Sequence, residues 1–194
     1  MENKKIIILI GIFAILVISG VVIYSWYNVQ YDENLSKANG YQTIALKTIN
    51  QDINNVMKET IIDRDILKSK LPAMKNALNE SINANSNITF YLNEAKKYVR
   101  NDVEKEFVDL LLKNNEVNNK VNDYQKERLD IIEKYVNGDI SFNDAGTQLI
   151  ELNNKSQIIE TESQKVNNEI IKLLAENPSF KQHLVDLGVN NFVA

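Results

Sequence analysis

The sequence has no cysteine, a single histidine and two prolines among its 194 residues. Without cysteine the chain can form no disulfide, has no thiol nucleophile and offers no thiolate ligand for zinc. His183, the one histidine, has no Glu three residues before it, so the Glu-x-x-His repeats of di-metal helical bundles are missing too. Gly-rich phosphate loops and G-x-S-x-G elbows are also missing. We therefore expect a protein that is not an enzyme and that binds neither metal nor cofactor.

Residues that break helices and form turns are scarce as well. No proline lies between Pro72 and Pro178, and the glycines of that stretch are Gly138 and Gly146. Strands and the turns between them need frequent punctuation by such residues. The scarcity predicts an all-α fold built from long helices.

Neither sign of charge is in large excess. The chain has 22 Lys and Arg against 26 Asp and Glu, a formal net charge of −4. The basic residues are mixed with acidic ones along the chain and form no stripe that could neutralise a row of phosphates. We therefore expect no nucleic acid among the partners.

What the sequence does have is one long apolar run near its start. No charged side chain lies between Ile6 and Tyr24. Residues 6–27 are long enough to cross a hydrocarbon layer of about 30 Å as a helix, and Trp26 and Tyr27 end the run with rings that favour the headgroup level. We predict a transmembrane signal-anchor helix. The alternatives are a cleaved signal peptide, which would have a shorter apolar core, and the buried helix of a soluble protein.

The charges around this run predict its orientation. Lys4 and Lys5 precede it, whereas acidic residues such as Asp32 follow it. Positive residues tend to stay on the cytoplasmic side of a membrane. We expect residues 1–5 to be a cytoplasmic tail and residues 28–194 to be one extracytoplasmic domain in the cell envelope, with the lipid bilayer as a partner of the anchor.

Two long heptad patterns predict a coiled-coil hairpin in the second half of the chain. The predicted helices 102–137 and 142–176 both carry mainly apolar residues at alternating spacings of three and four. If the chain reverses at Gly138, residues equally far from it face each other, as Tyr135 would face Phe142. An antiparallel arrangement of the two helices follows.

Capping residues mark where these helices begin and end. Gly138 is placed where a helix commonly needs a left-handed residue just past its last turn. Ser141 with Asp144 three residues later resembles a capping box for the next helix. Ser179 is the predicted N-cap of a short last helix.

A weaker apolar pattern lies upstream. It predicts a helix over residues 35–69 and a second one over 72–100, with Pro72 in the first turn of the latter. In the register that fits best, Ile53 would face Ile88.

Helix 72–100 could also continue into helix 102–137 as one rod. Asn101 followed by Glu104 would cap a fresh start, so we expect a turn at 100–102. The domain is then an antiparallel four-helix bundle with short loops and a short C-terminal helix.

Polar residues on the apolar seams are the candidate site. Asn114 and Ser163 would face each other in the hairpin, and Arg128 lies on the same seam. These residues, with Ser81 and Asn85 upstream, could line a polar pocket, and Arg128 could hold an anionic ligand. The alternatives are that polar seam residues set the register of the helices and that the Arg128 stem reaches past its apolar neighbours to water.

The predicted layout resembles two known families in architecture. An anchor followed by outer helices resembles LemA-type membrane proteins, and the four-helix arrangement resembles the ligand-sensing domains of chemoreceptors; no shared motif carries either likeness. We expect a membrane-anchored envelope protein that acts as a scaffold, through contacts with another protein or with itself. The alternatives are a small-molecule sensor that signals through a partner membrane protein, and an envelope hydrolase, for which we find no nucleophile and base.

Overall fold

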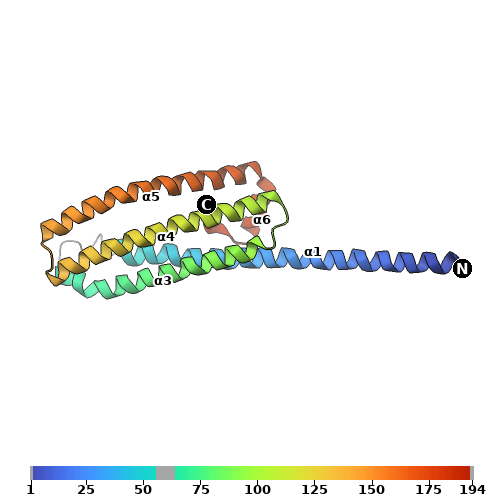
Figure 1. Ribbon diagram of the computed structural model, residues 1–194, viewed down its shortest axis with the longest axis horizontal. Helices are drawn as coiled ribbons and strands as arrows, with labels where there is room; N and C mark the ends of the chain where they lie inside the picture. Colours follow the sequence, from blue (N-terminus) through green and yellow to red (C-terminus); the bar gives the residue numbers. More distant parts are fainter. Residues whose placement is uncertain (1, 56–63, 193–194) are drawn as a thin grey trace.

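The computed structural model of the chain describes residues 2–55 and 64–192, and for residues 2–20 and 55 it describes the backbone only. Within those ranges the chain forms helices and no strand (Figure 1), as the sequence predicts. The elements are α1 (Glu2–Lys47), the π-helix η1 (Thr48–Asn55), α3 (Arg64–Lys96), α4 (Asp102–Asn137), α5 (Phe142–Glu176), α6 (Pro178–Asp186) and the 3₁₀-helix η2 (Asn190–Phe192).

The long helices lie side by side in an elongated bundle. Helix α3 packs against α1 and α4, and α5 packs against α4 (Figure 1). Helix α1 is much longer than its share of the bundle and continues beyond it toward the N-terminus. At the end where α1 leaves, the segment formed by α6 and η2 folds back so that η2 contacts α1. We call this end the base of the bundle and the opposite end the tip.

Most side chains of the predicted membrane span lie outside what the structure describes. Residues 6–27 belong to the backbone of α1, but the side chains of the first 20 residues are not described. Within the residues that the structure describes, no helix is both long and apolar enough to cross a bilayer.

The hairpin of α4 and α5 has the predicted register near its turn. The rings of Tyr135 and Phe142 lie 5.9 Å apart, centre to centre. The phenol of Tyr124 donates a hydrogen bond of 2.7 Å to Oδ1 of Asn153, a pair equally far from the turn. The antiparallel pairing around Gly138 is therefore confirmed.

The caps of this hairpin are also as predicted. Gly138 ends α4 with φ at +85°, in the left-handed region, and a Cβ there would come within 2.7 Å of Nη2 of Arg64. Ser141 and Asp144 form a capping box at the start of α5, with Asp in place of the usual Glu.

The turn between α3 and α4 lies close to its predicted place. Helix α3 ends at Lys96 and α4 begins at Asp102, so the two are separate helices. Oδ1 of Asn101 accepts a hydrogen bond of 2.9 Å from the amide of Glu104, which is the expected cap.

The predicted register of the first hairpin is wrong. Helix α3 already begins at Arg64, so the chain reverses upstream of the predicted turn and Pro72 lies inside a helix. Consequently Ile53 packs at the tip, whereas Ile88 packs in a different cluster toward the base. The physical reason is that α3 gains a longer buried stripe by starting early, with Leu67 and Leu71 both buried, and this outweighs the backbone hydrogen bond that Pro72 cannot make.

The predicted start of the last helix is also wrong. Its N-cap is Asn177 rather than Ser179, and the Asn177 side chain makes no capping hydrogen bond. Pro178 occupies the first turn, where its missing N–H costs nothing and its fixed φ suits the helix. Gly188 ends this segment with φ at +71°.

The buried apolar side chains form two clusters along the bundle. The base core is the larger and includes Tyr31, Leu35, Leu92, Phe107, Leu111, Val166, Ile170, Leu184 and Phe192. The tip core consists of Ile53, Leu67, Leu71, Met74, Ala77, Leu78, Leu129, Ile132 and Val136. Without disulfides, these two cores supply the main stabilisation of the fold.

Candidate functional site

A layer of uncharged polar side chains lies at mid-height of the bundle, between most of the base core and the tip core. On α4 it falls between Leu111 of the base core and Leu129 of the tip core. We call it the polar belt, and its members, all buried except the half-buried Asn118, are Gln42, Ser81, Asn85, Asn115, Asn118, Asn122 and Gln125. Burying polar groups costs free energy unless they are hydrogen-bonded, so the pairing within the belt decides what this layer can do.

Hydrogen bonds made by belt side chains link α3 to α4. Ser81 Oγ donates to Asn122 Oδ1 at 2.9 Å, and Asn85 Nδ2 donates to Asn119 Oδ1 at 3.2 Å. Nδ2 of Asn115 donates to the carbonyl oxygen of Asn85 and to Thr89 Oγ1, both at 2.8 Å. These bonds fix the register of the two helices at mid-height.

The pairing is incomplete. Oδ1 of Asn85, Oδ1 of Asn115, Nδ2 of Asn122 and Oε1 of Gln125 are all buried, and none has a hydrogen-bond partner in the described part of the chain. Most buried polar atoms in folded proteins do have one. The belt therefore holds both an unused donor and unused acceptors.

The π-helix η1 joins the tip side of the belt to α4. Oδ1 of Asn54 accepts hydrogen bonds from Gln125 Nε2 at 3.1 Å and from Arg128 Nη1 at 3.4 Å. Burial lowers the pKa of the Arg128 guanidinium from its ordinary value. No carboxylate of the described residues forms an ion pair with Arg128. Its cationic group is held by the Asn54 amide oxygen instead.

A pocket of about 170 Å³ opens into the belt between α1, η1, α3 and α4. We call it the belt pocket. Its polar lining consists of Gln42, Asn50, Ser81, Asn85, Asn118 and Asn122. Its apolar lining comes from Ala45, Leu46, Ile49 and Val121. Among these lining side chains, none is ionisable.

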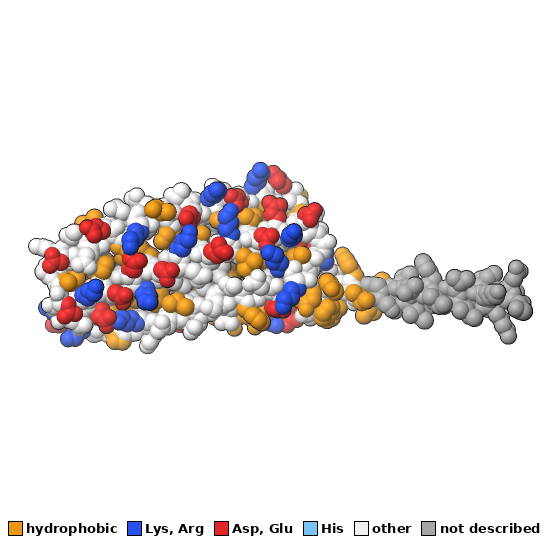
Figure 2. Space-filling model, viewed as in Figure 1, with side chains coloured by type: hydrophobic (Ala, Val, Ile, Leu, Met, Phe, Trp, Pro, Cys, Tyr) orange, Lys and Arg blue, Asp and Glu red, His pale blue; other side chains and the backbone are white. Residues whose placement is uncertain are grey.

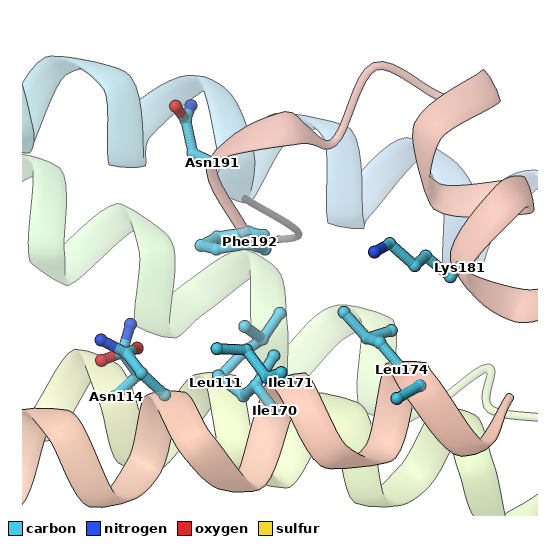
Figure 3. A pocket seen from close by; sticks show the side chains of 10 residues that line it. Leu111, Asn114, Ile170, Ile171, Leu174, Lys181, Asn191 and Phe192 are labelled. Carbon is cyan, nitrogen blue, oxygen red and sulfur yellow. The ribbon is translucent and has the colours of Figure 1, made fainter. Parts of the chain in front are cut away.

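A second pocket, of about 300 Å³, lies nearer the base and includes Asn114 (Figure 3). Leu111 and Ile170 lie at its floor, and Lys181 and Asn191 approach from the C-terminal segment. Of the three predicted site residues, this pocket brings in Asn114 alone.

The other two predicted site residues lie elsewhere. Ser163 is half-buried on α5 and lines neither of the two pockets described above. Arg128 contacts η1 through Asn54 and lines neither pocket. Asn85 and Ser81, the upstream candidates, do line the belt pocket.

Sequence reasoning missed the α4 residues of the belt, although a signal for them exists. Asn115, Asn118, Asn122 and Gln125 continue with Leu129 at alternating spacings of three and four. This second heptad pattern is one residue out of step with the first, and its side chains face α3 and α1 while the first faces α5. A helix that packs against neighbours on two sides has two buried seams. On α4 both seams contain polar residues, and the predicted heptad pattern includes only the seam that faces α5.

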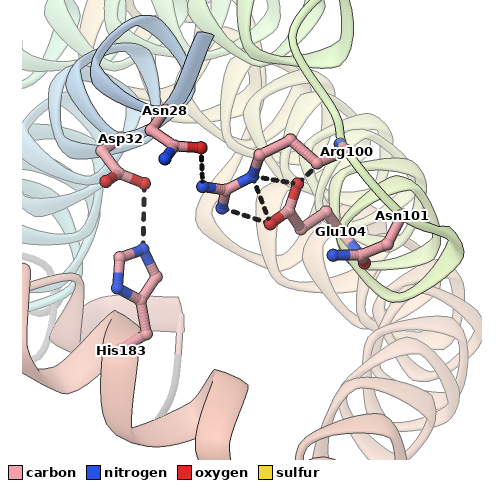
Figure 4. Close-up of polar contacts among 6 residues, drawn as sticks. All are labelled: Asn28, Asp32, Arg100, Asn101, Glu104 and His183. Carbon is pink, nitrogen blue, oxygen red and sulfur yellow. Dashed lines mark hydrogen bonds and ion pairs between the residues drawn. The ribbon is translucent and has the colours of Figure 1, made fainter. Parts of the chain in front are cut away.

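A separate polar cluster holds the base together (Figure 4). Arg100 Nε donates to Glu104 Oε1 at 2.8 Å, and the Arg100 guanidinium also reaches the side-chain oxygen of Asn28 on α1. His183 Nε2 lies 3.0 Å from Asp32 Oδ1, which ties α6 to α1. Hydrogen bonding to Glu104 raises the pKa of Arg100, so this buried carboxylate keeps a charged partner.

No group of three or more acidic or histidine side chains able to hold a metal ion occurs in the described ranges. Comparisons of the chain with models of known protein families, with curated proteins and with solved structures gave no match.

Proposed function

We propose that the protein is a membrane-tethered helical scaffold: residues 6–27 anchor it in a bilayer, and the extracytoplasmic bundle presents a protein-binding face. The observation that carries the proposal is the continuity of α1. The helix that contains the apolar run goes on without a break into the base core, where Tyr31, Leu35 and Ala38 are fully buried. The tether is thus the first helix of the bundle itself rather than a flexible linker.

A collar of exposed apolar side chains supports the membrane anchor. Figure 2 shows apolar side chains gathered where α1 leaves the bundle. The exposed members on α1 are Val21, Val22, Ile23, Tyr24, Trp26, Tyr27 and Val29. Contiguous apolar surface of this kind marks contact with a protein or a membrane, and its continuity with the apolar run favours the membrane.

The aromatic part of the collar also involves the turn between α3 and α4. Tyr98, in the turn between α3 and α4, meets Trp26 and Tyr27 edge to face, with ring centres 5.3 Å and 5.4 Å away. Tyr and Trp favour the headgroup level of a bilayer. The base of the bundle would therefore rest at the membrane surface.

The protein-binding face is the outward side of α5. Ile150 and Ile158 are each about two-thirds exposed. At about 3.6 residues per turn, Ile150 lies opposite the buried seam of Leu152 and Val166, and Ile158 lies on the flank of the helix. Ile171, more than half exposed, lies on the same side of the helix as Ile150. Large apolar side chains at the centre of such a face are typical anchors of protein interfaces.

An Ile150→Asp, Ile158→Asp double variant tests this face. We expect a complex larger than the monomer in native membranes solubilised with mild detergent, and we expect the double variant to lose it. The thermal midpoint should barely change, because exposed substitutions usually alter stability by about 0.5 kcal/mol or less. The mass of the intact complex, measured by native mass spectrometry, would show whether the partner is a second copy of the chain or a different protein.

The matched control is Ser86→Asp with Asn93→Asp, which adds the same charge to exposed positions of α3. This control should keep the complex. A wild-type chain that is monomeric in native membranes, or a double variant that keeps the complex, would count against the α5 face.

A specific observation favours a second candidate function, a small-molecule sensor whose output lies on a partner membrane protein. The belt pocket lies between α1 and two other helices of the bundle. A ligand bound there would alter the packing of the same helix that forms the tether. Ligand-induced shifts between packed helices are a known route for such signals.

A further inference from the structure

The chemistry of the belt pocket narrows the kind of ligand it can take. Its polar lining is made of amide and hydroxyl groups, and among the lining side chains none can offer a charge. Burying a charge without a partner is very costly. A ligand of this pocket is therefore uncharged.

Two lining residues supply opposite and unused hydrogen-bonding groups. Asn85, from α3, has a buried acceptor without a donor, and Asn122, from α4, has a buried donor without an acceptor. The rest of each side chain is already engaged, with Asn119 and Ser81 respectively. A ligand that carries a donor and an acceptor on one small planar group would pair with both.

We propose that the belt pocket binds a small uncharged carboxamide. Its carbonyl oxygen accepts from Nδ2 of Asn122, and its N–H donates to Oδ1 of Asn85. The proposal is independent of the membrane tether and gives the sensor alternative a ligand class.

The size and walls of the pocket suit such a molecule. About 170 Å³ corresponds to five or six water molecules at roughly 30 Å³ each, which is room for an amide group with a short alkyl chain. Leu46, Ile49 and Val121 provide apolar contacts for that chain. Ile49 and Asn50, which form part of the wall, belong to η1. Segments of π-helix are rare in proteins, and those that occur are often found at functional sites.

Three probes of nearly equal shape test the proposal on the full chain in lipid nanodiscs. Propionamide has both groups, butanone keeps the acceptor and lacks the donor, and propionate carries a charge. With methyl-labelled protein, we expect propionamide to cause saturable NMR shifts at Ile49 and Val121 and none at the exposed Ile150. Butanone should bind at least about tenfold more weakly, because it leaves Asn85 unpaired, and propionate should cause no saturable shift.

Two variants and a control test the residues. Asn85→Leu and Asn122→Leu should each weaken propionamide binding about tenfold or more. Asn83→Leu, the same change at an exposed position of α3, should leave it unchanged. The methyl spectrum of each variant reports whether the bundle remains folded; should a variant unfold, the comparison of probes on the wild-type chain decides.

Either of two results would overturn the proposal. One is the lack of any saturable shift with propionamide at roughly 100 mM, which is well above the millimolar affinity expected of so small a ligand. The other is binding of butanone as tight as that of propionamide. Neither result tests the membrane tether. If the chain binds the amide but has no signalling partner, the sensor function is rejected and the ligand proposal stands.

Discussion

At the scale of single residues, the base core contains one polar group that it does not satisfy. The Tyr31 ring is fully buried and lies against the Arg100 guanidinium, 5.3 Å from its centre. Its hydroxyl has no hydrogen-bond partner among the described residues. Burial and the Glu104 carboxylate raise the pKa of this phenol, so it stays neutral. The ring contributes packing and a cation–π contact, and the hydroxyl contributes only a desolvation cost.

Tyr31→Phe should therefore leave the free energy of unfolding unchanged or raise it by about 1 kcal/mol, because it removes an unpaired buried hydroxyl and keeps the ring. Urea unfolding of the full chain in detergent micelles measures this. Phe107→Ala, at a position equally buried in the same core, should lower the value by about 3 to 5 kcal/mol. A loss of more than about 1 kcal/mol in Tyr31→Phe would show that the hydroxyl has a partner, such as a bound water.

At the scale of elements, the sequence predicts helices well where it carries breakers or caps. Gly138, Ser141 and Asn101 end or begin helices where expected. Gly138 adopts the left-handed conformation that the end of α4 needs, and the side chains of Ser141 and Asn101 accept hydrogen bonds from free amides at the helix starts. The early start of α3 is not predicted, because the sequence between Asn55 and Arg64 contains neither glycine nor proline. The sequence predicts only part of the polar belt. The residue spacing along one helix indicates which side chains share a seam, whereas the belt pocket depends on how α1, α3 and α4 pack together.

The side chain of Asn39 makes two of the hydrogen bonds that dock the C-terminal segment onto α1. Its Oδ1 accepts from the amide of Asn191 at 3.0 Å, and its Nδ2 donates to the carbonyl oxygen of Gly188 at 3.2 Å. The Asn191 side chain adds a hydrogen bond of 2.6 Å to Thr43 Oγ1. These hydrogen bonds keep Phe192 packed in the base core.

Asn39→Ala should loosen this segment without unfolding the bundle. We expect faster amide hydrogen exchange at Leu184 and Val189 by roughly tenfold or more, since local opening becomes easier when docking bonds are lost, while amides of the tip core keep their protection. Asn87→Ala is the matched control, because that amide bonds only within its own helix. Unchanged exchange at Val189, or equal acceleration throughout the bundle, would contradict this role of Asn39.

At the scale of the whole molecule, the proposed anchoring depends on α1 being one continuous helix. At about 1.5 Å per residue, its 46 residues span roughly 70 Å, of which the bundle covers the C-terminal part (Figure 1). Since the bundle and the tether share this helix, the proposed anchor would fix both the height and the tilt of the bundle at the membrane. The aromatic collar of Trp26, Tyr27 and Tyr98 would then mark the headgroup level.

The most direct test is the depth of Trp26, the one tryptophan of the chain, in vesicles. The full chain is reconstituted with lipids brominated either near the headgroup end or near the methyl end of their acyl chains, and quenching of Trp26 fluorescence is compared. If the membrane tether is correct, the shallow bromines quench Trp26 more strongly than the deep ones. We expect the same order of quenching in a Trp26→Phe, Tyr98→Trp variant, which moves the fluorescent reporter to the turn between α3 and α4. Emission that neither lipid quenches would contradict the membrane tether.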